Sequence, residues 1–217
     1  QKFKIATLFT LVEDFTIQFS KKGKTSTRKT APSFEQKPPE SHDKPKAKRA
    51  KLGKYLFLLG VTDENGTVIP KMADKFKQIN KYLEIIDGLL KNANLPKTIK
   101  VVDMGSGKGY LTFALYDFLV NQRKMEATII GIEARQDLVD FCNKTAQECG
   151  FENLKFEHKT IQEFNTKKID ILIALHACDT ATDDAIFKGM KANATLIVTA
   201  PCCHKQIRQQ LKGKEQQ

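Results

Sequence analysis

The stretch Lys100-Val-Val-Asp-Met-Gly-Ser-Gly-Lys-Gly-Tyr-Leu-Thr-Phe-Ala114 is the most informative part of this sequence. It begins as an apolar run that ends in Asp103, and glycines follow at positions 105, 107 and 109. A helical spacing of apolar residues then runs from Leu111 to Leu119. A strand, a glycine-rich turn and a helix in this order place a ligand at the helix N-terminus, where the backbone can approach it closely.

Two common glycine motifs do not fit this turn. A nicotinamide-binding turn needs G-x-G-x-x-G, but Tyr110 stands where the third glycine would fall, and the P-loop pattern G-x-x-x-x-G-K-[ST] is absent. The compact G-x-G-x-G, with Asp103 two positions before the first glycine, instead resembles motif I of the S-adenosylmethionine-dependent methyltransferases.

The chain around this turn alternates apolar runs with helical patterns. An amphipathic helix is predicted from Met72 to about Asn92, ahead of the turn. Further strands are predicted at 127–133, 154–157, 169–175 and 195–200, and further helices at 137–149 and 180–192. The residues of 137–149 predicted to face inward are Leu138, Phe141, Cys142, Ala146 and Cys149. Buried strands alternating with helices predict an α/β fold, Rossmann-like and doubly wound, with a mainly parallel sheet.

Ligands of such folds lie at the carboxyl ends of the strands. Glu133 ends the second strand, thirty residues after Asp103, where a carboxylate can accept hydrogen bonds from both hydroxyls of a ribose. An acid placed there by chance is the alternative. The methyltransferase resemblance implies that the glycines hold the methionine part of S-adenosylmethionine, that Asp103 fixes its ammonium group and that residues 159–161 contact the adenine. The cofactor-binding candidates are therefore Asp103, Gly105, Ser106, Gly107, Gly109, Glu133, Ala134, Thr160, Ile161 and Leu175.

Two loops make the resemblance more specific. Leu-His-Ala-Cys-Asp-Thr-Ala-Thr-Asp at 175–183 follows the fourth strand, and Pro-Cys-Cys-His at 201–204 follows the fifth. Together with motif I and the helix at 74–80, they resemble a branch that includes the tRNA 2′-O-methyltransferases of the acceptor stem and related methyltransferase-like proteins. The likeness covers about residues 52–210. Relatives often have Gly where this chain has Asp179, which leaves the geometry of that loop open.

The resemblance also places the methyl acceptor beside these two loops. Their candidate catalytic residues are His176, Cys178, Asp179, Cys202, Cys203 and His204. A hydroxyl acceptor would need a base, for which His176, Asp179, His204 or Lys108 is available. Cys202 or Cys203 could instead be a nucleophile for carbon-five methylation of a pyrimidine. A metal site is a further alternative, but the spacing matches no standard zinc pattern. We favour small residues that line the acceptor pocket, with no metal.

The positive charge is concentrated in one segment. The 217 residues carry a net charge of +11, and residues 21–54 hold twelve Lys or Arg against three acids. That segment therefore carries +9 and the remainder only +2. Clustered Lys and Arg release phosphate counterions on binding nucleic acid. An RNA contact is the favoured interpretation, and a solvated linker is the alternative.

Three domains are expected. Residues 1–20 predict a β-hairpin, with Glu13-Asp14 as the turn, that could end a larger N-terminal domain. Residues 21–53 predict a basic flexible linker, and 54–217 the methyltransferase domain. Because only seventeen residues follow Ala200, the last helix and strands of that domain are expected to be missing.

The remaining composition bears on cellular location. No apolar run approaches the roughly 18 residues of a membrane helix, and no signal-peptide pattern opens the chain, which begins with Gln1. Five cysteines without framework-like spacing predict free thiols in a reducing, cytoplasmic setting.

The sequence thus predicts an S-adenosylmethionine-dependent methyltransferase that acts on RNA, either tRNA or rRNA. A protein or small-molecule acceptor is the first alternative, and a non-catalytic module that retains the fold is the second. Intact Asp103, Glu133 and three glycines argue against the second alternative, because a decayed site should have lost some of them.

Overall fold

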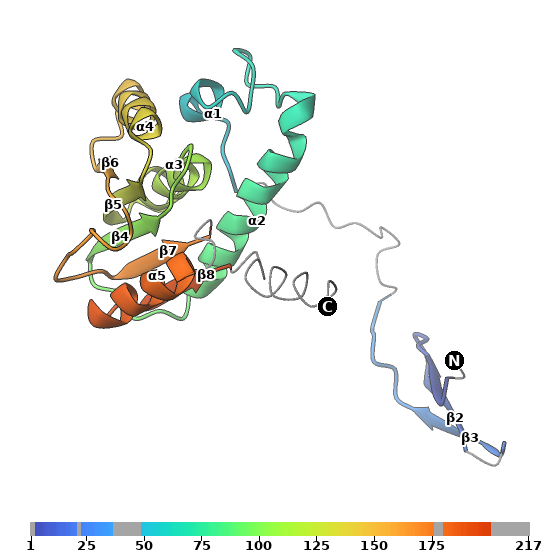
Figure 1. Ribbon diagram of the computed structural model, residues 1–217. Coiled ribbons are helices and arrows are strands. Elements are labelled where there is room, and N and C mark those ends of the chain that lie inside the picture. The colour runs from blue at the N-terminus through green and yellow to red at the C-terminus, as the bar shows by residue number, and fades with distance from the viewer. Residues whose placement is uncertain (1–2, 21–22, 37–48, 176–179, 201–217) are drawn as a thin grey trace, which may run out of the picture. The chain divides into compact units, whose positions relative to one another are not determined.

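The computed structural model of this chain describes residues 3–20, 23–36, 49–175 and 180–200 (Figure 1). The predicted site residues at 176–179 and 201–204 lie outside these ranges. The chain divides into two compact units, Gln1–Ala47 and Lys48–Gln217, and each is described by itself.

A parallel sheet of five strands forms the centre of the second unit (Figure 1). Its spatial order is β6-β5-β4-β7-β8, so the chain adds strands on one side of β4 and then crosses to the other. The α/β fold class predicted from the sequence is confirmed. The strands are β4 (Thr98–Met104), β5 (Glu126–Glu133), β6 (Leu154–His158), β7 (Ile171–Ala174) and β8 (Leu196–Thr199).

Helices cover both faces of this sheet. Side chains of β4 alternate between them: Val101 packs with the helices before β6, whereas Val102 packs with α5 and the segment before β7. No helix of the described residues is long and apolar enough to cross a membrane. The helices are α1 (Lys54–Leu58), η1 (Pro70–Met72), α2 (Ala73–Leu90), α3 (Tyr110–Tyr116), which continues into the π-helix η2 (Asp117–Gln122), α4 (Gln136–Cys149) and α5 (Thr180–Lys191).

Aromatic rings fill the layer between α3 and the sheet. The rings of Phe113 and Phe156 stack with their centroids 5.4 Å apart, and both side chains are fully buried. Phe156 of β6 pairs in register with Gly131 of β5, and its ring occupies the space that a side chain at 131 would need. A Cβ atom on Gly131 would lie 2.4 Å from Cδ1 of Phe156.

We therefore expect Gly131→Ala to destabilise the fold. Overpacking a buried site of this kind typically reduces the free energy of unfolding by about 1–3 kcal/mol. Gly88→Ala in α2 is the matched control, because its Cβ would meet nothing within 4 Å. That substitution should stabilise the helix by about 0.5–1 kcal/mol. Denaturant unfolding of both variants measures the difference, and equal effects would contradict this description of the core.

The first unit is an antiparallel sheet of three strands in the order β1-β2-β3, namely β1 (Ile5–Leu8), β2 (Asp14–Phe19) and β3 (Thr25–Thr30). The predicted hairpin at 1–20 corresponds to β1 and β2. The prediction that residues 21–53 form a flexible linker is wrong for 25–30, which pair with β2 from Phe19↔Thr25 to Asp14↔Thr30. Three threonines give this polar segment its strand propensity. The linker prediction rested on the basic, polar composition and did not weigh those threonines.

The linker prediction also extends too far at its other end. Arg49 pairs through Nη2 with Oδ2 of the buried Asp87 at 2.8 Å, and its carbonyl accepts a hydrogen bond from Gln122. The Ala50 N–H donates to Oδ1 of Asn80, and the Ala50 side chain is buried. The packed part of the second unit therefore begins by residue 49 rather than at 54.

Candidate functional site

The glycine-rich turn between β4 and α3 has a backbone that side chains rarely tolerate. Gly105, Gly107 and Gly109 have φ values of 77°, 57° and 72°, all in the left-handed region. The N–H groups of Gly105 and Ser106 both donate to the carbonyl oxygen of Ile132, at 2.8 and 3.0 Å. The turn is thus fastened to the end of β5, the next strand of the sheet.

Asp103 lies inside the protein beneath this turn. Its side chain is buried, and Oδ2 accepts a hydrogen bond of 2.5 Å from the Thr112 hydroxyl at the start of α3. Burial raises the pKa of Asp103 to about 6, and the bond from Thr112 offsets only part of that rise. The fold therefore holds a carboxylate whose negative charge has no cationic partner among the described residues.

Glu133, at the end of β5, has the opposite electrostatic setting. Oε2 accepts the Gly107 N–H at 2.8 Å, and Oε1 accepts the main-chain N–H of Arg135 at 3.1 Å and its Nε–H at 2.9 Å. Burial alone would raise the pKa of Glu133, but the hydrogen bonds from Arg135 and Gly107 and the Arg135 charge lower it below the ordinary value. This carboxylate is ionised at neutral pH.

An open cleft of about 450 Å³ lies between the turn and the carboxyl ends of β5 and β6. Six of the ten predicted cofactor residues line it, namely Gly105, Gly107, Glu133, Ala134, Thr160 and Ile161. The other four lie beside it: Asp103 and Ser106 are buried, Gly109 caps α3, and Leu175 is half-buried after β7.

The cleft also contains Lys159, from the segment predicted to contact the adenine, and four residues that the prediction did not include: Ile132, Arg135, Gln162 and Ala181. Hydrogen bonds join two segments of its wall. His158 Nε2 lies 2.9 Å from the Ala134 carbonyl oxygen, and the Thr160 N–H and hydroxyl both donate to Oε2 of Glu163 at 2.9 Å. Arg135 stands two positions after Glu133, but its contact with that acid depends on side-chain geometry that sequence spacing does not reveal.

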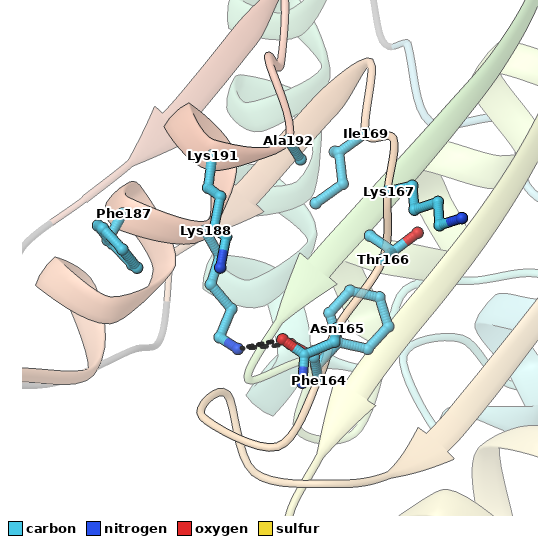
Figure 2. A pocket seen from close by; sticks show the side chains of 9 residues that line it. All are labelled: Phe164, Asn165, Thr166, Lys167, Ile169, Phe187, Lys188, Lys191 and Ala192. Carbon is cyan, nitrogen blue, oxygen red and sulfur yellow. Dashed lines mark hydrogen bonds between the residues drawn. The ribbon is translucent and has the colours of Figure 1, made fainter.

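A second cleft has a volume of about 460 Å³ (Figure 2). It is bounded by the segment Phe164–Ile169, which precedes β7, and by the last turns of α5. Lys188 closes one side by donating from Nζ to the carbonyl oxygen of Phe164 at 2.5 Å and to Oδ1 of Asn165 at 3.3 Å. No predicted site residue lines this cleft.

The predicted catalytic residues cannot be placed against this geometry. His176, Cys178 and Asp179 fall in 176–179, and Cys202, Cys203 and His204 in 201–217, outside the described residues. Their roles as base, nucleophile or pocket lining stay predictions. Lys108, the remaining candidate base, is exposed in the glycine turn. In the described part of the chain, no group of three His, Cys, Asp or Glu side chains could hold a metal ion.

A sequence profile described as a methyltransferase domain matches residues 74–210, well over half of the chain. The chain belongs to this methyltransferase family. The match begins in α2 and includes the glycine turn, Glu133 and both Cys/His loops. The membership predicted from motif I is confirmed at this level.

Individual relatives cover only part of the chain. A glutathione S-transferase C-terminal domain-containing protein of Bos taurus is 29% identical over 130 residues, which are 60% of this chain and 19% of that protein. The uncharacterized methyltransferase YcgJ of Bacillus subtilis is 27% identical over 123 residues, 55% of this chain and 46% of that protein. The chain thus spans about a fifth of the length of the first relative.

Solved structures are similar to part of this chain at low identity. A SAM-dependent methyltransferase of Geobacter sulfurreducens, in complex with S-adenosyl-L-homocysteine, is 18% identical with a TM-score of 0.38. The likeness covers 52% of this chain and 43% of that one.

The buried Asp103 predicts an unusual pH dependence of stability. Because its folded-state pKa of about 6 lies above that of an exposed aspartate, the folded protein binds the proton more tightly, and stability falls as pH rises from about 4 to 6. Asp103→Asn should therefore raise the free energy of unfolding at pH 7 by up to about 3 kcal/mol. The gain should disappear near pH 4.

Asp170→Asn is the control for this experiment. Asp170 is also buried, but its carboxylate pairs with Lys168 at 3.3 Å and accepts the Lys100 N–H at 2.7 Å. Its replacement should lower stability, since a partnered charge is lost. Denaturant unfolding at several pH values measures both variants. A loss of stability in Asp103→Asn at pH 7 would contradict the account of an unpaired buried charge.

Proposed function

We propose that this chain binds S-adenosylmethionine in the cleft beside the glycine turn and transfers its methyl group to an acceptor. The observation that carries the proposal is the bond from the Gly107 N–H to Glu133, which joins the two strand ends at one wall of the cleft. Family membership and the parallel sheet support the same cofactor. A non-catalytic module would not need to retain the contact between Gly107 and Glu133.

Each part of the cofactor has a suitable neighbour. Left-handed glycines at 105 and 107 allow the methionine part to approach the backbone, and Asp103 nearby would favour its ammonium group. Glu133 is ionised and can accept a ribose hydroxyl. Thr160 and Ile161 offer a small polar and an apolar wall for the adenine.

When bound, the cofactor supplies an activated methyl group on a sulfonium. The contribution of this chain is to hold that group in line with the acceptor, because correct orientation provides much of the rate of a displacement reaction. The proton released by a hydroxyl or amine acceptor needs a base. We assign that base, and the lining of the acceptor pocket, to the loops that carry His176, Cys178 and Cys202.

Two substitutions test the cofactor site. Gly107→Val places a branched side chain at a φ of 57° and disturbs the N–H that binds Glu133, and Glu133→Ala removes the acceptor for the ribose. Calorimetry with S-adenosylhomocysteine should show at least a tenfold loss of affinity in each variant. This factor corresponds to about 1.4 kcal/mol, in the range of one hydrogen bond to a charged group.

Gly66→Val is the matched control for Gly107→Val. Gly66 has a similar left-handed φ of 78°, a Cβ on either glycine would meet nothing within 4 Å, and Gly66 does not line the cleft. Its replacement should leave affinity unchanged. Equal affinities of wild type, Gly107→Val and Glu133→Ala for S-adenosylhomocysteine would refute the proposed cofactor site.

We further propose that the acceptor is RNA, contacted through the basic segment 21–54. Three of its twelve Lys and Arg side chains already have partners: Lys29 with Glu13, Arg49 with Asp87 and Lys54 with the Glu148 carbonyl. Of the six that the structure describes, Lys24, Arg28 and Lys51 have no side-chain partner within the described ranges and are available for phosphates. The likeness of the two Cys/His loops to tRNA methyltransferases favours tRNA within this class.

The RNA proposal is tested by salt dependence rather than by deleting the segment. A deletion of 21–54 would remove β3 and the Arg49–Asp87 pair together with the charge. The triple variant Lys24→Gln, Arg28→Gln, Lys51→Gln should instead make the slope of log affinity against log salt shallower. For single-stranded RNA, each phosphate that is no longer neutralised should reduce the slope by about 0.7.

The control changes three exposed lysines elsewhere, Lys77, Lys97 and Lys155, to Gln, which alters net charge equally. Its slope should match that of wild type. A triple variant in 21–54 with the wild-type slope would favour a protein or small-molecule acceptor. The cytoplasmic location stays a prediction from cysteine usage, and Cys142 and Cys149 are free thiols.

A further inference from the structure

Arg135 lines the cofactor cleft but has no role in the function proposed above. It lies two residues after Glu133, the last residue of β5, and contacts that acid twice, through its main-chain N–H at 3.1 Å and its side-chain Nε–H at 2.9 Å. Both bonds end on the same oxygen, Oε1. The Arg135 side chain is 63% exposed, whereas Glu133 is only 7% exposed, so the interaction affects mainly the carboxylate.

The hydrogen bonds divide the two oxygens of Glu133 into different roles. An ionised carboxylate offers about four acceptor positions, two on each oxygen. Arg135 fills both positions on Oε1, and the Gly107 N–H fills one on Oε2. The remaining position is therefore on Oε2, the oxygen that also binds the glycine turn.

The charge of Arg135 also matters, because a bound ligand would exclude more water from Glu133. Burial alone disfavours the anionic form of this carboxylate, and the bonds and charge of Arg135 contribute most to reversing that effect. Cys142 of α4 also faces Glu133, but burial and the Glu133 charge raise the pKa of its thiol to about 12, which keeps it neutral. Lys159 also lines the cleft, and its Nζ donates a hydrogen bond of 2.9 Å to Oε2 of Glu157.

We propose that Arg135 is a positioning residue for the cofactor ribose, which holds Glu133 so that Oε2 alone accepts a ribose hydroxyl. The inference rests on the proposed binding of S-adenosylmethionine and adds a residue that acts on the ligand only through Glu133. Arg135 orients the carboxylate, keeps it ionised when the ligand covers it, and makes no direct contact with the ribose.

The test compares two ligands by calorimetry: S-adenosylhomocysteine and its 2′,3′-dideoxy analogue, which lacks both ribose hydroxyls. Arg135→Ala should bind S-adenosylhomocysteine about five- to tenfold more weakly, the effect of one typical hydrogen bond. It should bind the dideoxy analogue as wild type does. Arg135→Lys should recover part of the loss, because it restores the positive charge and one donor.

Two controls separate positioning from other effects. Lys155→Ala removes an exposed cation of β6 that does not line the cleft and should leave the affinity for both ligands unchanged. In a Glu133→Gln background, Arg135→Ala should cause no further loss, since its effect passes through the carboxylate. Thermal unfolding of Arg135→Ala should match wild type, because the side chain is largely exposed.

Three outcomes would overturn the proposal. Tighter or equal binding of S-adenosylhomocysteine by Arg135→Ala would show that Arg135 competes with the ribose or is irrelevant to it. An equal loss for both ligands would show a contact elsewhere on the cofactor. A further loss in the Glu133→Gln background would show that Arg135 acts without Glu133. Failure of the wild type to bind S-adenosylhomocysteine would instead refute the proposed function as well.

Discussion

The hydrogen bond from the Gly107 N–H to Oε2 of Glu133 is the interaction on which the proposed site depends. It requires a left-handed glycine in the turn after β4 and an ionised acid at the end of β5, so it unites two separate features of the sequence. Two further bonds, from Gly105 and Ser106 to the Ile132 carbonyl, fix the same pair of strands. Without them the cleft would lose one of its walls.

The two acids of the site are held in contrasting ways. Asp103 is buried beside a hydroxyl, and its pKa rises, whereas the hydrogen bonds and charge around Glu133 lower its pKa. An unpaired buried charge reduces stability unless a cation arrives. The buried charge of Asp103 therefore destabilises the unliganded fold, and the ammonium group of the proposed ligand would offset this cost. Glu133, in contrast, already has hydrogen-bond donors from the protein.

Much of this could be predicted from the sequence, because the strand cores are continuous apolar runs and the glycines mark one turn. Predictions failed where tertiary contacts outweigh local pattern. The strand Thr25–Thr30 was missed because of its charge. In α4, Cys142 and Ala146 are buried as predicted, but Val139 and Thr145 are buried as well and Phe141 is 39% exposed. Arg135 was missed because its role depends on a rotamer of Glu133 that no spacing reveals.

Amide hydrogen exchange with and without S-adenosylhomocysteine tests the central claim most directly, because it reports on each backbone N–H of the turn. The account predicts that the ligand slows exchange at residues 105–109, 133–135 and 160–162, which surround the cleft. The segment 164–169 and the end of α5, at the second cleft, should not change (Figure 2). Protection confined to that second cleft, or no protection in the glycine turn, would contradict the proposed cofactor site.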